Sequence, residues 1–289
     1  MTTKKAVKIA IAYDFDGTLA PGNMQEHTFF PSMNIPAAEF WAKANQIARE
    51  NDMDEILAYM QLSLDEARLR NLPIRRQDFE NYGKGITFFD GVEGYFERIN
   101  KYAEELGVEL QHYIISSGLR EFIKGTSIAK HFTNIYASGY RYDANDVAVW
   151  PALAINYTNK TQYLFRINKG INNSYDNSLI NKYLPEEERP VPFRQMIYIG
   201  DGETDVPAMK MIKYQGGTAI GVYNDKIGPT KDKLSPKQAC ENLIIQNRAN
   251  YIAPANYTEG SELDRLIKLV IEKIKAEVDL QRFAGERRV

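Results

Sequence analysis

One short segment near the N-terminus decides the fold: residues 6–18, AVKIAIAYDFDGT. A mostly apolar run of this length that ends in a turn is typical of a buried strand in a parallel sheet. The run ends at Asp14 and Asp16, and Gly17 follows where the chain would turn. Side chains alternate along an extended chain, so Asp14 and Asp16 point the same way and Phe15 points elsewhere. The segment therefore predicts a strand that brings two carboxylates to one cleft.

Strands and helices alternate along most of the chain beyond this segment. Short apolar runs typical of strands occupy four further ranges: 109–115, 196–199, 218–222 and 251–253. Helical periodicity follows most of them, and a last helix is expected over 263–274. A hairpin is expected near 140–150 and a surface excursion over 168–192. This order predicts an α/β fold with a Rossmann-like parallel sheet, helices on both faces, and ligands beyond the carboxyl ends of the strands.

Residues 20–85 depart from this alternation. Their apolar side chains recur at helical spacing, and Pro36 and Asp52 lie where two helices would start. We therefore expect an α/β core made of residues 1–19 and 86–289, with a small helical cap inserted between them. Four side chains are expected to form the cap's own core: Phe40, Trp41, Met53 and Met60.

Composition limits the partners of the chain. It has 36 Lys and Arg against 38 Asp and Glu, a formal net charge of −2, so nothing favours a nucleic-acid or anionic-membrane partner. The single Cys240 allows no internal disulfide, and three scattered histidines form no usual zinc site. Charged Lys8 interrupts the N-terminal apolar run, and no apolar stretch is long enough to span a bilayer. We expect a cytoplasmic protein with no membrane partner, whose oligomeric state stays open.

Polar residues follow three of the predicted strands. They are Asp14 with Asp16, Ser116 with Ser117, and Asp201 with Asp205. Carboxyl ends of parallel strands meet at one edge of the sheet, so the pocket there would hold several carboxylates. Such a cluster repels itself unless its pKa values shift or a divalent cation binds. Oxygen ligands without His or Cys favour Mg²⁺, and Mg²⁺ favours a phosphate substrate.

These motifs resemble the haloacid dehalogenase superfamily, in its phosphoserine-phosphatase-like branch with a helical cap. The resemblance rests on DFDGT at 14–18, Ser116 after an apolar strand, a lysine before a helix, and GDGETD at 200–205. It implies a magnesium-dependent phosphatase that hydrolyses a small phosphomonoester metabolite through an aspartyl-phosphate intermediate.

The resemblance also implies a role for each motif residue. Asp14 would be the nucleophile, and Asp16 would protonate the leaving group and then activate water. The phosphate would be bound by Ser116, Ser117, Gly118 and Lys160. The metal would be held by Asp14, by Asp16 through its backbone carbonyl, by Asp201 and by Asp205.

Several of these assignments have alternatives. Lys169 competes with Lys160, but Lys160 starts a helical segment while Lys169 is followed by Gly170 and a polar stretch. Choosing Lys160 requires the excursion at 168–192 to be an insertion. Ser117 could replace Ser116 as the phosphate contact, and Asp205 could simply cap the helix that contains Pro207. Arg75 and Arg76 could bind a second anionic group of the substrate, or form a solvated face.

Other functions use part of the same residues. A phosphotransferase or phosphomutase would form the same aspartyl phosphate and pass it to another acceptor. A dehalogenase would need neither metal nor Asp16, and a non-catalytic phosphate-binding protein would be expected to have lost a carboxylate. The chain has no GxxxxGK[ST] loop, so a P-loop enzyme is not supported.

Overall fold

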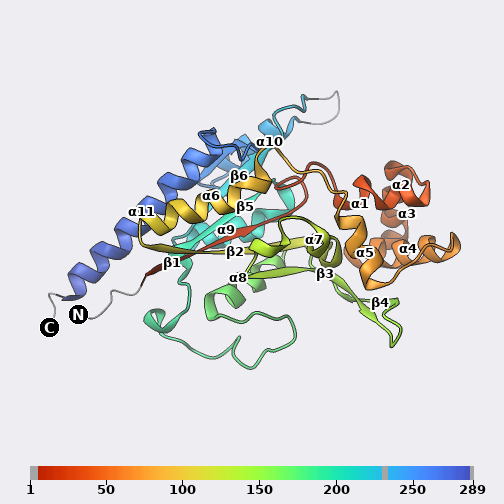
Figure 1. The fold of residues 1–289 in the computed structure, drawn as a ribbon, viewed down its shortest axis with the longest axis horizontal. Coiled ribbons are helices and arrows are strands. Elements are labelled where there is room, and N and C mark those ends of the chain that lie inside the picture. Colours follow the sequence, from red (N-terminus) through yellow and green to blue (C-terminus); the bar gives the residue numbers. More distant parts are fainter. Residues whose placement is uncertain (1–5, 230–233, 287–289) are drawn as a thin grey trace.

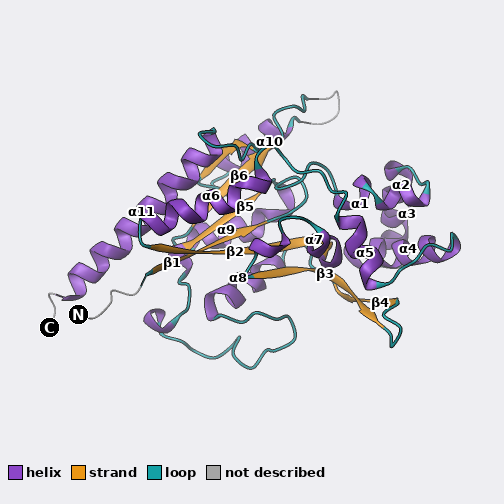
Figure 2. Ribbon diagram, viewed as in Figure 1, coloured by secondary structure: helices purple, strands orange, loops and turns teal. Residues whose placement is uncertain are grey.

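The computed structural model describes residues 6–229 and 234–286. They form a seven-stranded sheet with helices on both faces, and five helices between the first strand and α6 lie at the end of the molecule away from the termini (Figure 1). Figure 2 shows the same strands and helices by type. The predicted α/β class with a Rossmann-like sheet is confirmed.

The sheet has the strand order β4-β3-β2-β1-β5-β6-β7. Neighbouring strands are parallel except for the antiparallel pair β3 and β4. The strands are β1 (Val7–Tyr13), β2 (Val108–Leu119), β3 (Asn134–Tyr142), β4 (Ala148–Leu153), β5 (Met196–Gly200), β6 (Thr218–Tyr223) and β7 (Tyr251–Pro254). The core helices are α6 (Val92–Glu105), α7 (Arg120–Gly125), α8 (Lys160–Lys169), α9 (Val206–Tyr214), α10 (Pro236–Ile245) and α11 (Glu262–Glu286).

Strand β1 is buried on both faces. Ile9, Ile11 and Tyr13 belong to one hydrophobic cluster, which also contains side chains of α6 and α11. Ala10 and Ala12 belong to the other cluster, on the side of α8, α9 and α10. Because both faces are covered by helices, the strand is apolar almost throughout, as a parallel strand in such a fold should be.

The inserted helices pack directly on the core. They are α1 (Met24–His27), α2 (Phe29–Met33), α3 (Ala37–Glu50), α4 (Glu55–Leu69) and α5 (Arg76–Gly83). Phe29, Phe40 and Tyr59 share one hydrophobic cluster with Ile9 and Tyr13 of β1, so this apolar interior runs from the insertion into the sheet. The division into a core and a cap at residues 20–85 stays a prediction.

Local details differ from the sequence expectations in two places. Helix α4 begins at Glu55, three residues after the expected start at Asp52, because Asp54 is the N-cap and its carboxylate accepts the backbone N–H groups of Ile56 and Leu57. The last helix extends well past residue 274. The hairpin is present as β3 and β4, and residues 171–192 form an irregular excursion.

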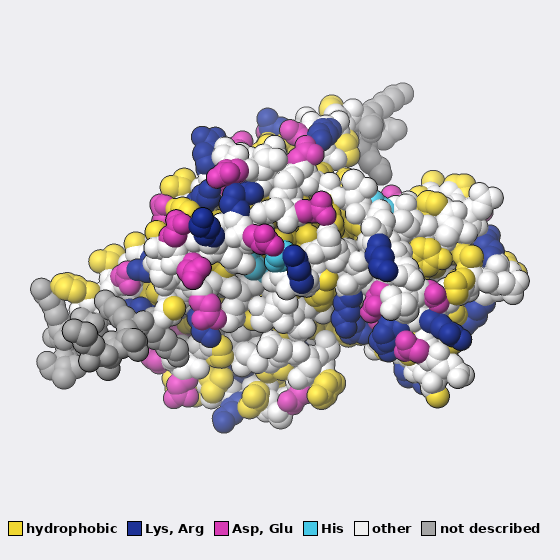
Figure 3. Space-filling model, in the orientation of Figure 1, with side chains coloured by type: hydrophobic (Ala, Val, Ile, Leu, Met, Phe, Trp, Pro, Cys, Tyr) yellow, Lys and Arg dark blue, Asp and Glu magenta, His cyan; other side chains and the backbone are white. Residues whose placement is uncertain are grey.

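The surface carries both signs of charge. Lys and Arg are interspersed with Asp and Glu on the face drawn in Figure 3, as the small net charge suggests. None of the described helices combines the length and the hydropathy that a membrane span requires.

Candidate active site

The register of the sheet brings three chain segments to one edge. Tyr13, the last residue of β1, pairs with Ile114 of β2 on one side and Ile199 of β5 on the other. The residues that follow these positions therefore emerge together at the carboxyl ends of the central strands. In this way residues distant in sequence, such as Asp14 and Asp201, become neighbours.

Three carboxylates and one lysine form a buried cluster at this edge. Oxygens of Asp14, Asp201 and Asp205 all lie within 4.8 Å of one another. The Nζ of Lys160, at the start of α8, lies 3.1 Å from Asp14 Oδ2 and 2.7 Å from Asp205 Oδ1. Lys160 has no exposed surface and Asp14 only 5%. We call these four residues the acid cluster.

Asp205 is the most completely bonded member of the acid cluster. Besides Lys160, it accepts hydrogen bonds from the hydroxyl of Tyr198 at 2.6 Å and from the backbone N–H of Asp201 at 3.2 Å. Asp205 occupies the N-cap position of α9, but its side chain makes no capping bond. Its carboxylate therefore positions Lys160 and Asp201 instead of stabilising the helix end.

The electrostatics of the cluster favour an additional cation. Burial, reinforced by the charge of Asp205 and opposed by Lys160, raises the pKa of Asp14 to about 7. Burial and the neighbouring Asp205 and Asp14 also raise the pKa of Asp201 well above its usual range. Burial disfavours the charged form of Lys160, but Asp14 and Asp205 outweigh this and raise its pKa. One ammonium thus faces three carboxylates, which leaves excess negative charge.

The acid cluster fits a divalent metal ion. All of its candidate ligands are carboxylate oxygens, the donor type that Mg²⁺ prefers, and the described residues bring no Cys or His into the group. Three carboxylates and one ammonium carry a formal charge of −2, which one divalent cation would neutralise.

Asp16 lies beside the acid cluster and is held separately. Its Oδ1 accepts the backbone N–H of Met24 at 2.8 Å, at the start of α1. Burial, followed by the charge of Asp14, raises the pKa of Asp16 well above its usual range. Its carboxylate is not part of the metal-competent group. Asp16 is therefore a carboxyl group suited to hold a proton.

Gly17 explains how the chain turns so closely around the cluster. Its φ is +70°, in the left-handed region, and a Cβ atom there would lie 2.1 Å from Asp201 Oδ2. Any larger residue would displace that carboxylate. The glycine predicted as a turn residue is thus also required by the close approach of Asp201.

The serine loop after β2 contributes backbone groups as well as side chains. Ser116 is 1% exposed, and its Oγ accepts the N–H of Gly118 at 3.0 Å. Ser117 lines both cavities described below, and Ser116 is not among the residues that line them. Tyr59 of α4 donates its hydroxyl to the carbonyl of Ser117 at 2.7 Å, which ties the insertion to this loop.

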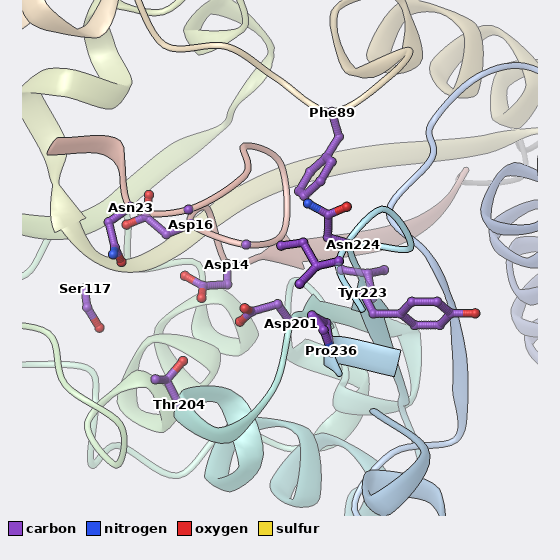
Figure 4. Close-up of a pocket in the computed structure, with 14 residues that line it drawn as sticks. Asp14, Asp16, Asn23, Phe89, Ser117, Asp201, Thr204, Tyr223, Asn224 and Pro236 are labelled. Carbon is purple, nitrogen blue, oxygen red and sulfur yellow. The ribbon is translucent and has the colours of Figure 1, made fainter. Parts of the chain in front are cut away.

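Two adjoining cavities lie at this edge of the sheet, and the first is lined by Asp14 and Asp201 of the acid cluster. The first, which we call the acidic cavity, has a volume of about 290 Å³, and in Figure 4 the carboxylates of Asp14 and Asp201 point to the same side of it. Its lining includes Asp14, Asp16, Asn23, Phe89, Ser117, Asp201, Thr204 and Asn224. The second, the cap cavity, has a volume of about 310 Å³ and lies between the inserted helices and the core. Its lining is Asp16, Asn23, Gln25, Trp41, Ala44, Asn45, Glu55, Ile56, Tyr59, Ser117, Gly118, Tyr157 and Thr204.

The structure distinguishes the alternatives left open by the sequence. Lys169 donates to the backbone carbonyls of Leu179, Ile180 and Lys182 in the excursion and does not reach the carboxylates. Arg75 and Arg76 line neither cavity. Arg76 instead pairs with Asp146 at 3.1 Å and stacks on Tyr142.

Sequence reasoning missed most of the residues that the insertion contributes. Trp41 was expected in the interior of the cap, and it does pack there, yet it also lines the cap cavity. Gln25 and Tyr59 gave no signal because isolated residues on helices have no diagnostic spacing. A search for polar residues within apolar helical stripes would have found Gln25, since it sits between Met24 and Phe29, both fully buried.

The chain thus combines a Rossmann-like parallel sheet, helices inserted after β1, and a buried acid cluster at the carboxyl ends of the central strands. The family model of haloacid dehalogenase-like hydrolases matches residues 11–210, and the chain belongs to this family. A Borreliella burgdorferi protein recorded as "Uncharacterized protein" is 30% identical over 296 residues, covering 92% of this chain and 96% of that protein.

Solved structures share the fold at low sequence identity. A hydrolase of the same family from Salmonella enterica serovar Typhi has a TM-score of 0.53 and 15% identity, over 90% of this chain and 70% of that one. A phosphoserine phosphatase in a phospho-aspartyl intermediate analogue form has a TM-score of 0.50 and 14% identity, over 91% and 99%. The prediction of a hydrolase of this family, with the fold of its phosphoserine-phosphatase-like branch, is confirmed.

Proposed function

We propose that this hydrolase is a magnesium-dependent phosphatase that acts on a small phosphomonoester through an aspartyl phosphate on Asp14. The observation that carries the proposal is the acid cluster itself: Asp14, Asp201 and Asp205 within 4.8 Å, with Lys160 bonded to two of them. Asp16 beside the cluster supplies a second kind of carboxyl group, one whose raised pKa suits proton transfer.

The chemistry follows from these positions. In the first step an oxygen of Asp14 attacks phosphorus, the ester P–O bond breaks, and the proton of Asp16 passes to the leaving oxygen. In the second step water attacks phosphorus, its proton passes to Asp16, and the P–O bond to Asp14 breaks. Inorganic phosphate and the original enzyme result, so one difficult displacement becomes two easier ones.

The remaining residues bind and orient. Ser116, the backbone of Ser117 and Gly118, and Lys160 are proposed to hold the phosphoryl oxygens, with Lys160 also fixing Asp14 at 3.1 Å. Mg²⁺ would be held by Asp14, the backbone carbonyl of Asp16, and Asp201, with Asp205 supporting its shell. When bound, it supplies positive charge that offsets the repulsion between carboxylate and phosphate.

Hydrolysis of p-nitrophenyl phosphate tests the proposal directly. We expect activity with Mg²⁺, loss of activity with EDTA, and a decrease of at least about 10³-fold in kcat for Asp14→Asn. Asp65→Asn removes an exposed carboxylate of α4 outside both cavities and serves as the matched control. Full activity of Asp14→Asn would contradict the proposal. Transfer of phosphate to an added alcohol in place of water would favour the phosphotransferase alternative.

A further inference from the structure

The cap cavity continues directly from the acidic cavity. Both are lined by Asp16, Asn23, Ser117 and Thr204. If the phosphoryl group of a substrate lies at Asp14, as the proposed function requires, the rest of the ester has the cap cavity beside it. A volume of about 310 Å³ suits a small molecule. The chemistry of this lining therefore selects the leaving group.

The charged side chains in the described lining of the cap cavity are acidic, and none is basic. Glu55 lines it as a carboxylate, Asp16 lines it as the carboxyl group that holds a proton in the proposed chemistry, and its described lining contains no Lys, Arg or His. Lys160, the cation of the acid cluster, is fully buried between Asp14 and Asp205. A leaving group with its own carboxylate would meet the like charge of Glu55 and no cationic partner, which costs binding free energy. The cavity therefore disfavours acidic leaving groups.

Aromatic side chains form another part of the same wall. The rings of Trp41 and Tyr59 meet edge to face with centroids 5.7 Å apart. The indole N–H of Trp41 donates to Glu26 at 2.8 Å, which fixes the ring in place. Across the cavity, the hydroxyl of Tyr157 donates to Glu55 Oε2 at 3.0 Å. Aromatic rings next to a carboxylate attract cations, and above all ammonium groups.

We infer that the substrate is a phosphomonoester of a small amino alcohol, with a protonated amine and no carboxylate on its leaving group. The ammonium would lie among Trp41, Tyr59 and Glu55. This inference rests on the proposed function for the position of the phosphate, and on the cap cavity alone for the charge of the leaving group. It separates this chain from an enzyme that selects phosphoserine.

Three esters that differ in one feature test it. O-phosphoethanolamine and O-phosphoserine differ by a single carboxylate, and glycerol 3-phosphate is the ester of an uncharged alcohol of similar size. We expect kcat/KM with Mg²⁺ to be at least about tenfold higher for phosphoethanolamine than for either of the others, as one charged interaction would give. Equal or better hydrolysis of phosphoserine would overturn the inference, and so would preference for glycerol 3-phosphate.

A matched pair of variants locates the preference in the cap cavity. Glu55→Gln should lower the preference for phosphoethanolamine by about 3- to 10-fold, mainly through KM. Glu39→Gln removes an exposed carboxylate of α3 outside the cavity and should leave the preference unchanged. An equal effect of both variants would refute the role of Glu55.

A binding experiment distinguishes a failure of the proposed phosphatase function from a failure of the inferred substrate class. Calorimetric titration of the Asp14→Asn variant with the intact esters compares their affinities without turnover. Absence of hydrolysis of every ester, p-nitrophenyl phosphate included, would count against the proposed function. Absence of a preference for phosphoethanolamine in both binding and turnover would count against the inferred substrate class alone.

Discussion

Replacement of Lys160 by Met probes the electrostatic balance of the site. Met has a similar length, so the change removes a charge without leaving a large void. The Nζ of Lys160 is fully buried, 2.7 Å from Asp205 and 3.1 Å from Asp14. Removal of one partner from a buried ion pair costs about 3–5 kcal/mol, because the remaining charge is left uncompensated. We expect Lys160→Met to lose about this much unfolding free energy near pH 8 in EDTA.

The sign of the pH dependence follows from the carboxylates that remain. In the wild-type protein the pKa of Asp14 is already raised to about 7, and removal of the ammonium raises it further. A carboxyl group whose pKa is higher in the folded state binds more protons when folded, so its penalty shrinks as pH falls. The deficit of Lys160→Met should therefore be largest near pH 8 and clearly smaller near pH 5.5. Added Mg²⁺ should also reduce it.

Urea unfolding followed by tryptophan fluorescence measures these differences. Lys169→Met is the matched control, because its Nζ binds only backbone carbonyls of the excursion. Its stability difference from wild type should not change with pH or Mg²⁺. A Lys160→Met protein within about 1 kcal/mol of wild type near pH 8, or with a deficit independent of pH, would refute the reasoning.

Two further substitutions test individual contacts. Gly17→Ala should lower kcat by about 100-fold, because the Cβ of the new alanine would displace the carboxylate of Asp201. Gly107→Ala is the control, because it has a similar backbone cost but open space around the added Cβ. Equal kcat values for the two variants would contradict this prediction. Burial lowers the pKa of His112 to about 3, below its unfolded value, so its contribution to stability is complete above about pH 6.5 and decreases as pH falls. Between pH 7 and 5 wild type should lose about 2 kcal/mol more unfolding free energy than His112→Asn in urea titrations, and parallel losses would show the histidine to be unperturbed.

Much of the fold could be predicted because it rests on local patterns. The apolar run before Asp14 is long enough to identify a buried strand, and the turn at Gly17 marks its end. The carboxyl-end rule then predicts that Asp14 and Asp201 approach each other, although 186 residues separate them, and their oxygens do lie within 4.8 Å. The rule works because the carboxyl ends of parallel strands all lie along one edge of the sheet.

Contacts between the insertion and the core could not be predicted in the same way. Tyr59 reaches the carbonyl of Ser117, and Asp54 accepts from Asn156, through the packing of helices whose relative position no periodicity specifies. The lining of the cap cavity depends on that packing. For this reason the sequence identified the residues of the proposed chemistry but not those, such as Gln25, that face the leaving group.

The identity of the phosphorylated residue tests the central claim most directly. Enzyme mixed with a ³²P-labelled phosphomonoester and Mg²⁺ would be quenched in acid within its first turnovers, digested and analysed by mass spectrometry. The account predicts a hydroxylamine-sensitive phosphoryl group on the peptide that contains Asp14, and no such label in Asp14→Asn. A phosphoryl group on another residue, or rapid turnover with no labelled enzyme at any time, would contradict it.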